Sequence, residues 1–180
     1  MLLFFGRIDR RKGAESIIQE FPKLLEKDNR FHLVFAGKDG FPKGYLADLA
    51  SRLDITTHIT IENRFISDEE VSSFFSAADA VVLPYLRGTT SGVLKIAFAH
   101  KTPVIATKVG ELPETVKLYN AGIIIDLPLQ ESDINSIVSF VQNPNPEWLY
   151  SNYDELINRF SWDHAAERTI DFYNHVFFKN

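Results

Sequence analysis

The 180-residue chain contains no cysteine, which excludes disulfide bonds, thiolate metal sites and cysteine nucleophiles. This fits a reducing compartment, and we expect a cytoplasmic protein. No apolar run approaches the roughly 20 residues that are needed to cross a bilayer. A secretory signal is not indicated, because Arg7, Asp9 and Arg10 follow only a few apolar residues. The net charge of -5 argues against a general nucleic-acid or membrane surface but leaves room for a local basic pocket.

Several familiar catalytic motifs are also missing. The sequence has neither a Gly-x-Ser-x-Gly nucleophile elbow nor a Walker-type Gly-Lys-Ser/Thr loop. Its five histidines show no metal-ligand spacing, and they are His32, His58, His100, His164 and His175. We therefore expect no metal site in this chain.

What is present is a regular alternation of short apolar runs and helical patterns. Most runs are nearly continuous, as expected for strands buried on both faces. Six strands are predicted, at Leu2–Phe5, Phe31–Ala36, His58–Ile61, Ala80–Leu83, Val104–Ala106 and Gly122–Asp126. Helices are predicted between them, at Gly13–Lys27, Tyr45–Leu53, Ser67–Ala78, Ser91–Lys101 and Leu112–Tyr119. This order predicts an α/β fold, a Rossmann-like doubly wound parallel sheet with helices on both faces.

From about Gln130 the pattern turns wholly helical, which predicts a helical C-terminal extension. The expected helices are Ser132–Gln142, Glu147–Arg159 and Ser161–Phe178, the last with one apolar stripe at a period near 3.6. The length suits a single domain over residues 1–180. Met1 stands directly against a strand, so we expect a part of a longer protein, with a complete short protein as the alternative.

Ligands of doubly wound sheets bind beyond the carboxyl ends of the strands, and three segments fall there. The first is the turn in which Gly6 and Arg7 are followed by Lys12. Gly6 lets a ligand approach the backbone, Arg7 can hold phosphate oxygens in a forked contact, and Lys12 adds a mobile charge. The alternative is a solvated basic turn, which explains Arg7 poorly because Arg7 directly follows the strand.

The second segment is a Gly/Thr/Ser loop after the fourth strand, which leads into a helix at Ser91-Gly92-Val93. Unpaired backbone N–H groups and the helix dipole favour a phosphate there, and the Thr90 hydroxyl adds a donor. Plain N-capping by Thr90 or Ser91, which needs no ligand, is the alternative.

The third segment, Thr107 to Val116, follows the fifth strand. Glu111 and Glu114 are candidate acceptors for the hydroxyls of a sugar or ribose. The alternative, which spacing alone favours, is that they complement the positive end of a helix.

Taken in order, these segments resemble the C-terminal half of a GT-B glycosyltransferase. More narrowly, they resemble the retaining family 4 group (glycosyl transferases group 1), which uses nucleotide-activated sugars. The resembling pieces are "GRIDRRKG", "FHLVFAGKDG", "ITIENRFISDEEVSSFFSAADAVVLPY", "TTSGVLKIAFAHKTPVIATKVGELPETV" and "FSWDHAAERTIDFY". They run from Leu2 to about Phe177, and the ordered set is far more specific than any single piece.

The resemblance implies a donor-nucleotide site. Arg7 and Lys12 would bind the diphosphate and stabilise it as it leaves, the backbone at residues 91–93 would hold the distal phosphate, and the backbone around Arg64 and Phe65 would meet the nucleobase. The resemblance also implies that no metal is needed. The expected site residues are Gly6, Arg7, Lys12, Arg64, Phe65, Thr90, Ser91, Gly92, Val93 and Glu111.

The chain departs from the family pattern at the donor loop. Many members carry two glutamates eight residues apart, and this chain has Gly88 and Ile96 at those positions. Neither side chain accepts a hydrogen bond, which leaves open how the ribose and the donor sugar are held. Glu111 is a candidate substitute.

The second departure is length, since the N-terminal acceptor domain of a GT-B enzyme is absent from this sequence. We therefore expect weak nucleotide binding at best and no sugar transfer by this chain alone. We also expect Phe5, Phe65 and Tyr85 on an aromatic surface that partly faces the missing half.

The resulting interpretation is the donor domain of an enzyme that transfers a hexose-type sugar with retention, in polysaccharide biosynthesis. The donor is a UDP-, GDP- or ADP-sugar, and the acceptor is a glycan or a lipid-linked acceptor. We expect no cofactor and no nucleic-acid partner, and membrane association only through the missing half. The alternatives are a GT-B-like sugar-nucleotide epimerase domain and a flavodoxin-like regulatory or interaction module, although a phospho-acceptor receiver would need acidic residues where Gly6 and Arg7 stand.

Overall fold

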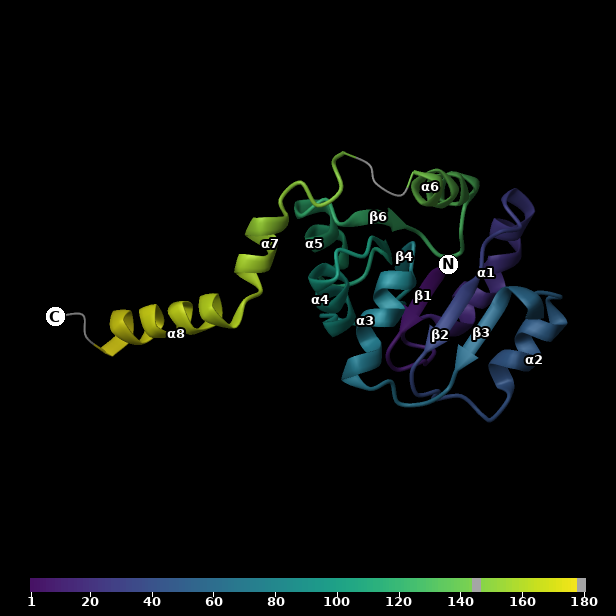
Figure 1. The fold of residues 1–180 in the computed structure, drawn as a ribbon, viewed down its shortest axis with the longest axis horizontal. Coiled ribbons are helices and arrows are strands. Elements are labelled where there is room, and N and C mark those ends of the chain that lie inside the picture. Colours follow the sequence, from purple (N-terminus) through teal and green to yellow (C-terminus); the bar gives the residue numbers. More distant parts are fainter. Residues whose placement is uncertain (144–146, 178–180) are drawn as a thin grey trace.

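The computed structural model describes residues 1–143 and 147–177, and its centre is one parallel sheet with helices packed around it (Figure 1). The strands are β1 (Leu2–Phe5), β2 (Leu33–Ala36), β3 (Ile59–Glu62), β4 (Ala80–Leu83), β5 (Val104–Thr107) and β6 (Gly122–Ile125). Each lies within two residues of its predicted bounds, and their order in the sheet is β3-β2-β1-β4-β5-β6. The doubly wound fold is confirmed.

Eight α-helices and one short 3-10 turn are described in the same residues. They are α1 (Ala14–Lys27), α2 (Tyr45–Arg52), η1 (Thr56–His58), α3 (Asp68–Ala77), α4 (Gly92–Ala99), α5 (Leu112–Leu118), α6 (Glu131–Gln142), α7 (Tyr153–Arg159) and α8 (Trp162–Phe177). The apolar side chains of α1, α2 and α6 pack with one face of the sheet, and those of α3, α4, α5 and α7 pack with the other.

Alternate residues of each strand supply the two apolar cores, as strand geometry requires. Phe4 and Phe35 point to the α1 face, with ring centres 5.0 Å apart, whereas Leu3 and Val34 belong to the opposite core. This two-sided burial explains why the strands appear in the sequence as continuous apolar runs.

The strand order reverses between β1 and β4. β1 pairs with both neighbours in parallel, so that Leu2 lies opposite Leu33 on β2 and opposite Ala80 on β4. The chain leaves β1 toward one face of the sheet and β4 toward the other, and such a switch point opens a crevice at the carboxyl edge. The loops over residues 6–13 and 84–91 follow β1 and β4 at this edge.

The predicted helix over residues 147–159 is wrong in its first half. The structure has turns at residues 147–152 and a helix only from Tyr153. Tertiary bonds explain the difference: the Tyr150 amide donates to the Asn120 carbonyl at 2.9 Å, and its hydroxyl donates to the Thr102 carbonyl at 2.7 Å. These bonds hold Tyr150 at a φ of 55°, which a continuous helix does not allow.

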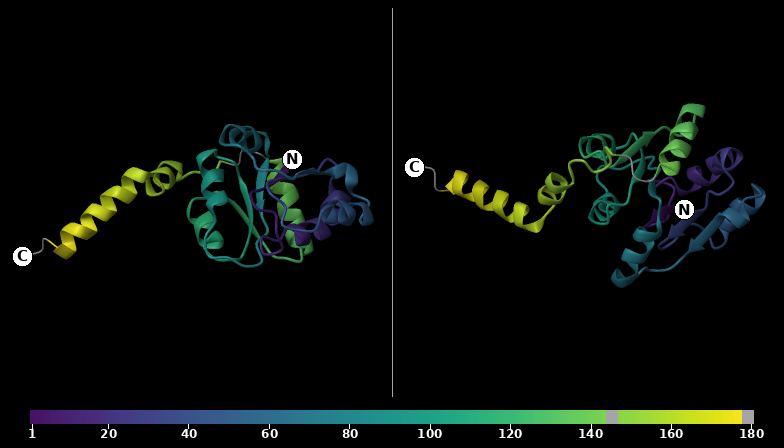
Figure 2. Two further views of the ribbon diagram at one scale, coloured as in Figure 1. Left: turned by 90° about the horizontal axis from the view of Figure 1, so that it is seen from below. Right: turned by 45° about the horizontal axis from the view of Figure 1, so that its top comes forward.

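The last helix, α8, points away from the body of the molecule in every view (Figures 1 and 2). Its apolar stripe is present as predicted, but no α8 residue is buried, and Trp162 is 90% exposed. The predicted end at Phe178 lies outside the described residues. Over residues 1–143 and 147–177, no helix is both long and apolar enough to cross a bilayer.

Candidate functional site

The loops after β1 and β4 are joined tightly at the switch point. Gly13 has a φ of +75°, and a Cβ there would lie 1.8 Å from the Pro84 carbonyl oxygen. The amides of Leu86 and Arg87 both donate to the Arg11 carbonyl, at 3.0 and 3.3 Å. Because only glycine permits this approach of two backbones, Gly13 fixes the loop at residues 6–13 against the loop at residues 84–91.

Ser91 opens α4 and is 1% exposed. Its Oγ accepts a hydrogen bond from the Leu94 amide at 3.2 Å, so the predicted N-capping by Ser91 is confirmed, whereas Thr90 is exposed. The Ser91 amide donates to Glu111 Oε1 at 2.7 Å. In a capping box, the side chain of the third helical residue accepts a hydrogen bond from the N-cap amide. Glu111 accepts the same kind of bond from the N-cap amide of α4, but it comes from the start of α5.

The next two amides of α4 remain open. Across the described residues, neither the Gly92 nor the Val93 amide donates to another group, and a Cβ at Gly92 would meet nothing within 4 Å. The Val93 side chain lies against Gly6, with Val93 Cγ2 3.4 Å from where a Gly6 Cβ would be. Unpaired amides at a helix N-terminus attract an anion, and the space beside the Gly92 Cα is open.

Lys12 reaches this place from the β1 loop. Its Nζ lies 3.6 Å from the centre of the Tyr85 ring, and the Tyr85 hydroxyl lies 2.8 Å from Ser91 Oγ. Lys12 and the cap of α4 are thus in contact with the same aromatic residue.

Arg7 lines a hollow of about 240 Å³ that Lys12 does not line. The hollow is lined by Phe5, Gly6, Arg7, Gly37, Lys38, Arg64, Phe65 and Ile66. The Arg7 side chain is 70% exposed, and its Nε lies 3.5 Å from Asp9 Oδ2. Gly6 lies next to both Val93 and Gly37, since a Cβ at Gly6 would lie 3.4 Å from Val93 Cγ2 and a Cβ at Gly37 would lie 1.8 Å from the Gly6 carbonyl oxygen. Arg7 thus lies beside Asp9 at this hollow, whereas Lys12 lies over the Tyr85 ring.

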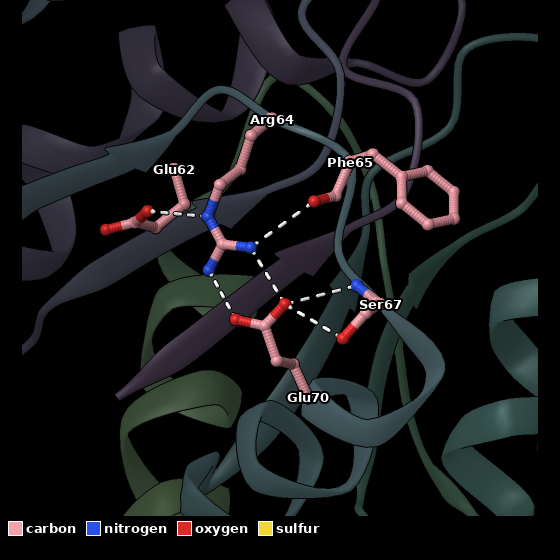
Figure 3. A network of polar contacts seen from close by, with 5 residues as sticks. All are labelled: Glu62, Arg64, Phe65, Ser67 and Glu70. Carbon is pink, nitrogen blue, oxygen red and sulfur yellow. Dashed lines mark hydrogen bonds and ion pairs between the residues drawn. The ribbon is translucent and has the colours of Figure 1, made fainter.

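Arg64 is held by carboxylates in the turn between β3 and α3 (Figure 3). Its guanidinium donates to both oxygens of Glu70, at 2.8 and 2.6 Å, and its Nε lies 3.4 Å from Glu62 Oε2. These hydrogen bonds lower the pKa of Glu70 to about 2. Two carboxylates neutralise the Arg64 guanidinium, so its main role is to hold the backbone of this turn and not to provide an unpaired positive charge for a ligand.

Phe65 follows Arg64 at the rim of the same hollow and is 81% exposed. Its ring points away from the carboxylates that hold Arg64 (Figure 3), and its carbonyl accepts from Arg64 Nη1 at 3.3 Å. An exposed ring beside a hollow offers a flat apolar surface to a planar ligand.

Two sequence expectations need correction in this region. Tyr85 was expected on an exposed aromatic surface, and it is 4% exposed, while Phe5 is half-buried. Tyr85 turns inward because its ring fills the space under Lys12 and its hydroxyl finds a partner in Ser91. The sequence offered no signal for this pairing, since Tyr85 stands in a loop without periodicity. Over the described part of the chain, no three or more His, Asp or Glu residues gather as a group that could hold a metal ion.

Comparisons with known proteins agree with this architecture. The family model of the glycosyl transferases group 1 matches residues 1–143. An uncharacterised glycosyltransferase of Methanocaldococcus jannaschii is 31% identical over 179 residues, which are 96% of this chain and 44% of the relative. The structure of sucrose-phosphate synthase from Thermosynechococcus elongatus matches with a TM-score of 0.76 at 25% identity, over 98% of this chain and 45% of that one.

A protein of Anabaena, solved in complex with UDP, matches with a TM-score of 0.77. It is 16% identical over 97% of this chain and 48% of that one, so it supports the fold alone. The fold and the crevice at its switch point define a Rossmann-like domain of the GT-B type. The chain belongs to the glycosyl transferases group 1 family, and it spans less than half the length of the relatives named here.

Proposed function

We propose that this chain is the donor-nucleotide domain of a sugar transferase and that it lies in the C-terminal half of a longer enzyme. The observation that carries the proposal is the pair of open amides at Gly92 and Val93, with the Lys12 ammonium beside their helix cap. A diphosphate fits this combination of a cation and unpaired N–H groups at a strand switch point.

The neighbouring hollow is the proposed place of the nucleobase. It lies next to the amides across Gly6, and the exposed Phe65 ring and the backbone at Arg64 border it. Arg7, at the mouth of this hollow, would contact the diphosphate from the nucleoside side. Glu111 Oε1 is already bonded to the Ser91 amide, so a contact to ribose or sugar would use its second oxygen.

The proposed reaction transfers a hexose-type sugar with retention to a glycan or a lipid-linked acceptor. The bond between the anomeric carbon and the distal phosphate oxygen breaks, the acceptor oxygen bonds to that carbon on the same face, and the acceptor proton leaves on the diphosphate. Lys12 and the two amides would stabilise the charge that develops on the departing diphosphate. No metal is required in this scheme.

The acceptor site belongs, in this proposal, to the part of the enzyme that this chain does not contain. The chain covers 44% of its archaeal relative, which is about what one half of a two-domain enzyme would cover. We therefore expect this chain to bind a nucleoside diphosphate and to transfer no sugar on its own.

A thermal-shift titration with UDP, GDP and ADP tests the nucleotide site. UDP is the first choice, because a structural neighbour was solved with it. At 100 times the Kd, a ligand adds about 2.7 kcal/mol to the free energy of unfolding and raises the Tm by several degrees. Lys12→Ala and Arg7→Ala should reduce this shift, whereas Arg52→Ala, an exposed cation of α2, should not.

Addition of EDTA should leave the nucleotide shift unchanged if the cations and amides are sufficient. No response to any of the three nucleotides would instead favour the flavodoxin-like interaction module. A response that Lys12→Ala and Arg7→Ala leave intact would place the nucleotide elsewhere on the domain, which would count against this donor site.

A further inference from the structure

Tyr85 contacts two parts of the proposed diphosphate site that come from different loops. Lys12 comes from the loop after β1, and Ser91 ends the loop after β4. The Lys12 Nζ lies 3.6 Å from the Tyr85 ring centre, and the Tyr85 hydroxyl lies 2.8 Å from Ser91 Oγ. One side chain therefore touches the cation and the helix cap at the same time.

Tyr85 is itself firmly placed. It is 4% exposed, and its carbonyl accepts a hydrogen bond from Thr107 Oγ1, at the end of β5, at 2.6 Å. The ring thus has a fixed backbone, a buried body and a bonded hydroxyl, which leaves it little rotational freedom. It is a rigid surface for whatever lies on its face.

Lys12 is anchored only at its backbone. The Lys12 amide donates to Asp9 Oδ1 at 2.9 Å, and the next residue, Gly13, is pressed against Pro84. The four-carbon side chain would otherwise sample many rotamers. Among the described residues, no carboxylate forms a salt bridge with Lys12.

An aromatic face and a carboxylate would hold this ammonium in different ways. A carboxylate would pair with the charge and compete with a phosphate, whereas the ring attracts the cation and leaves its outer N–H groups available. The Ser91 bond places the same ring next to the open amides of Gly92 and Val93. The arrangement orients a positive charge without neutralising it.

We propose that Tyr85 is a positioning residue of the donor site, which holds the Lys12 ammonium beside the α4 cap so that cation and amides contact one diphosphate. This inference rests on the proposed function. Tyr85 acts through Lys12 and does not itself bind the diphosphate.

A double-mutant cycle tests whether Tyr85 acts through Lys12. Binding is measured by calorimetric titration with whichever of UDP, GDP and ADP binds most tightly, and with inorganic pyrophosphate, which carries no base. Tyr85→Leu should weaken nucleoside diphosphate binding about tenfold, the size expected for a partly desolvated cation–π contact. The double variant Lys12→Ala/Tyr85→Leu should bind no more weakly than Lys12→Ala alone, because residues that act as one unit are not additive.

A conservative variant and a matched control accompany the cycle. Tyr85→Phe keeps the ring under Lys12 and loses only the bond to Ser91, so it should recover most of the affinity that Tyr85→Leu loses. Tyr153→Leu is the control, because Lys101 lies over the Tyr153 ring at 3.8 Å, far from the crevice, and affinity should not change. Independent, additive losses for Lys12→Ala and Tyr85→Leu would overturn the inference.

A measurement on the unaltered protein covers the case in which Tyr85→Leu does not fold. An ammonium over a ring places the Lys12 ε-methylene protons in the shielding region, so their NMR resonances should be shifted upfield, and Tyr85→Phe should keep the shift. Unshifted resonances would overturn the inference. If the unaltered chain binds no nucleotide and no pyrophosphate, the proposed function itself fails. If the unaltered chain binds but the losses in the cycle are additive, only the role of Tyr85 fails.

Discussion

Two glycines, Gly13 and Gly92, show that one residue type can stand in opposite surroundings, one closely packed and one open. Gly13 has a positive φ, and a Cβ there would overlap the Pro84 carbonyl oxygen. Gly92 has free space around its missing Cβ, at the first turn of α4. The sequence motifs contain both glycines, but only their surroundings separate a structural role from a binding role.

The two positions should therefore respond to substitution in opposite ways. Gly13→Ala should lower the free energy of unfolding by at least about 2 kcal/mol, because the new methyl group and the positive φ are both unfavourable. Gly92→Leu should leave the Tm nearly unchanged and abolish the nucleotide-induced shift, since the side chain would fill the space in front of the amides. Chemical denaturation and the thermal-shift titration measure the two effects, and tight binding by Gly92→Leu would exclude these amides as the phosphate site.

At the scale of elements, the turn from β3 into α3 is built around one carboxylate. Glu70 accepts hydrogen bonds from the Ser67 amide at 3.2 Å and from the Arg64 guanidinium (Figure 3). Ser67 followed three residues later by Glu70 is the sequence pattern of a capping box, and the structure contains this capping box. Its extension to Arg64 was not predicted, because the two side chains meet only after the turn has formed.

The lowered pKa of Glu70 predicts a change of stability with pH. Its pKa is about 2 in the folded chain, against an ordinary 4.5, so the unfolded chain binds more protons between these values. The stabilisation by Glu70 is thus complete above about pH 4.5 and is lost as the pH falls toward 2. Glu70→Gln should be less stable than the parent at neutral pH, with the difference shrinking in that window.

Urea unfolding at several pH values between 2 and 7 measures this difference. Glu26→Gln, which removes an exposed carboxylate of α1, is the matched control and should show no comparable narrowing. A difference between parent and Glu70→Gln that stays constant down to pH 2 would contradict the assignment.

The helix α8 contributes little to the stability of the domain. None of its residues is buried, and it extends away from the sheet (Figure 2). Ending the chain after Phe160 keeps the contacts of that ring with Phe98 and Tyr119. The shortened chain should melt within about 2 °C of the parent, because the truncation removes no buried residue among those that the structure describes. Scanning calorimetry measures the two Tm values, and a much lower Tm would show that α8 packs on the domain.

At the scale of the whole molecule, the proposed function asks an acidic chain to bind an anion locally. The net charge is -5, yet the carboxyl edge of β1 and β4 gathers Arg7, Lys12 and unpaired amides. Net charge is a property of the whole chain, and it does not determine the charge at one edge of the sheet. The strand order β3-β2-β1-β4-β5-β6 is what places this crevice between β1 and β4.

The sequence by itself determined the elements and the ordered motifs of this protein. Burial of every strand on two faces produces continuous apolar runs, and capping and turn residues mark the helix ends, so these features are local and readable. The helix predicted from residue 147 failed because Tyr150 is fixed by bonds to Asn120 and Thr102, which are distant in the sequence.

Only the tertiary structure decided how the candidate site residues are grouped. It placed Arg7 beside Asp9, bonded Glu111 to the cap of α4, and turned Tyr85 inward beneath Lys12. These arrangements depend on contacts between loops that follow different strands. A sequence motif shows which residues follow a strand. Which of these residues contact one another depends on side-chain packing between the loops at the switch point.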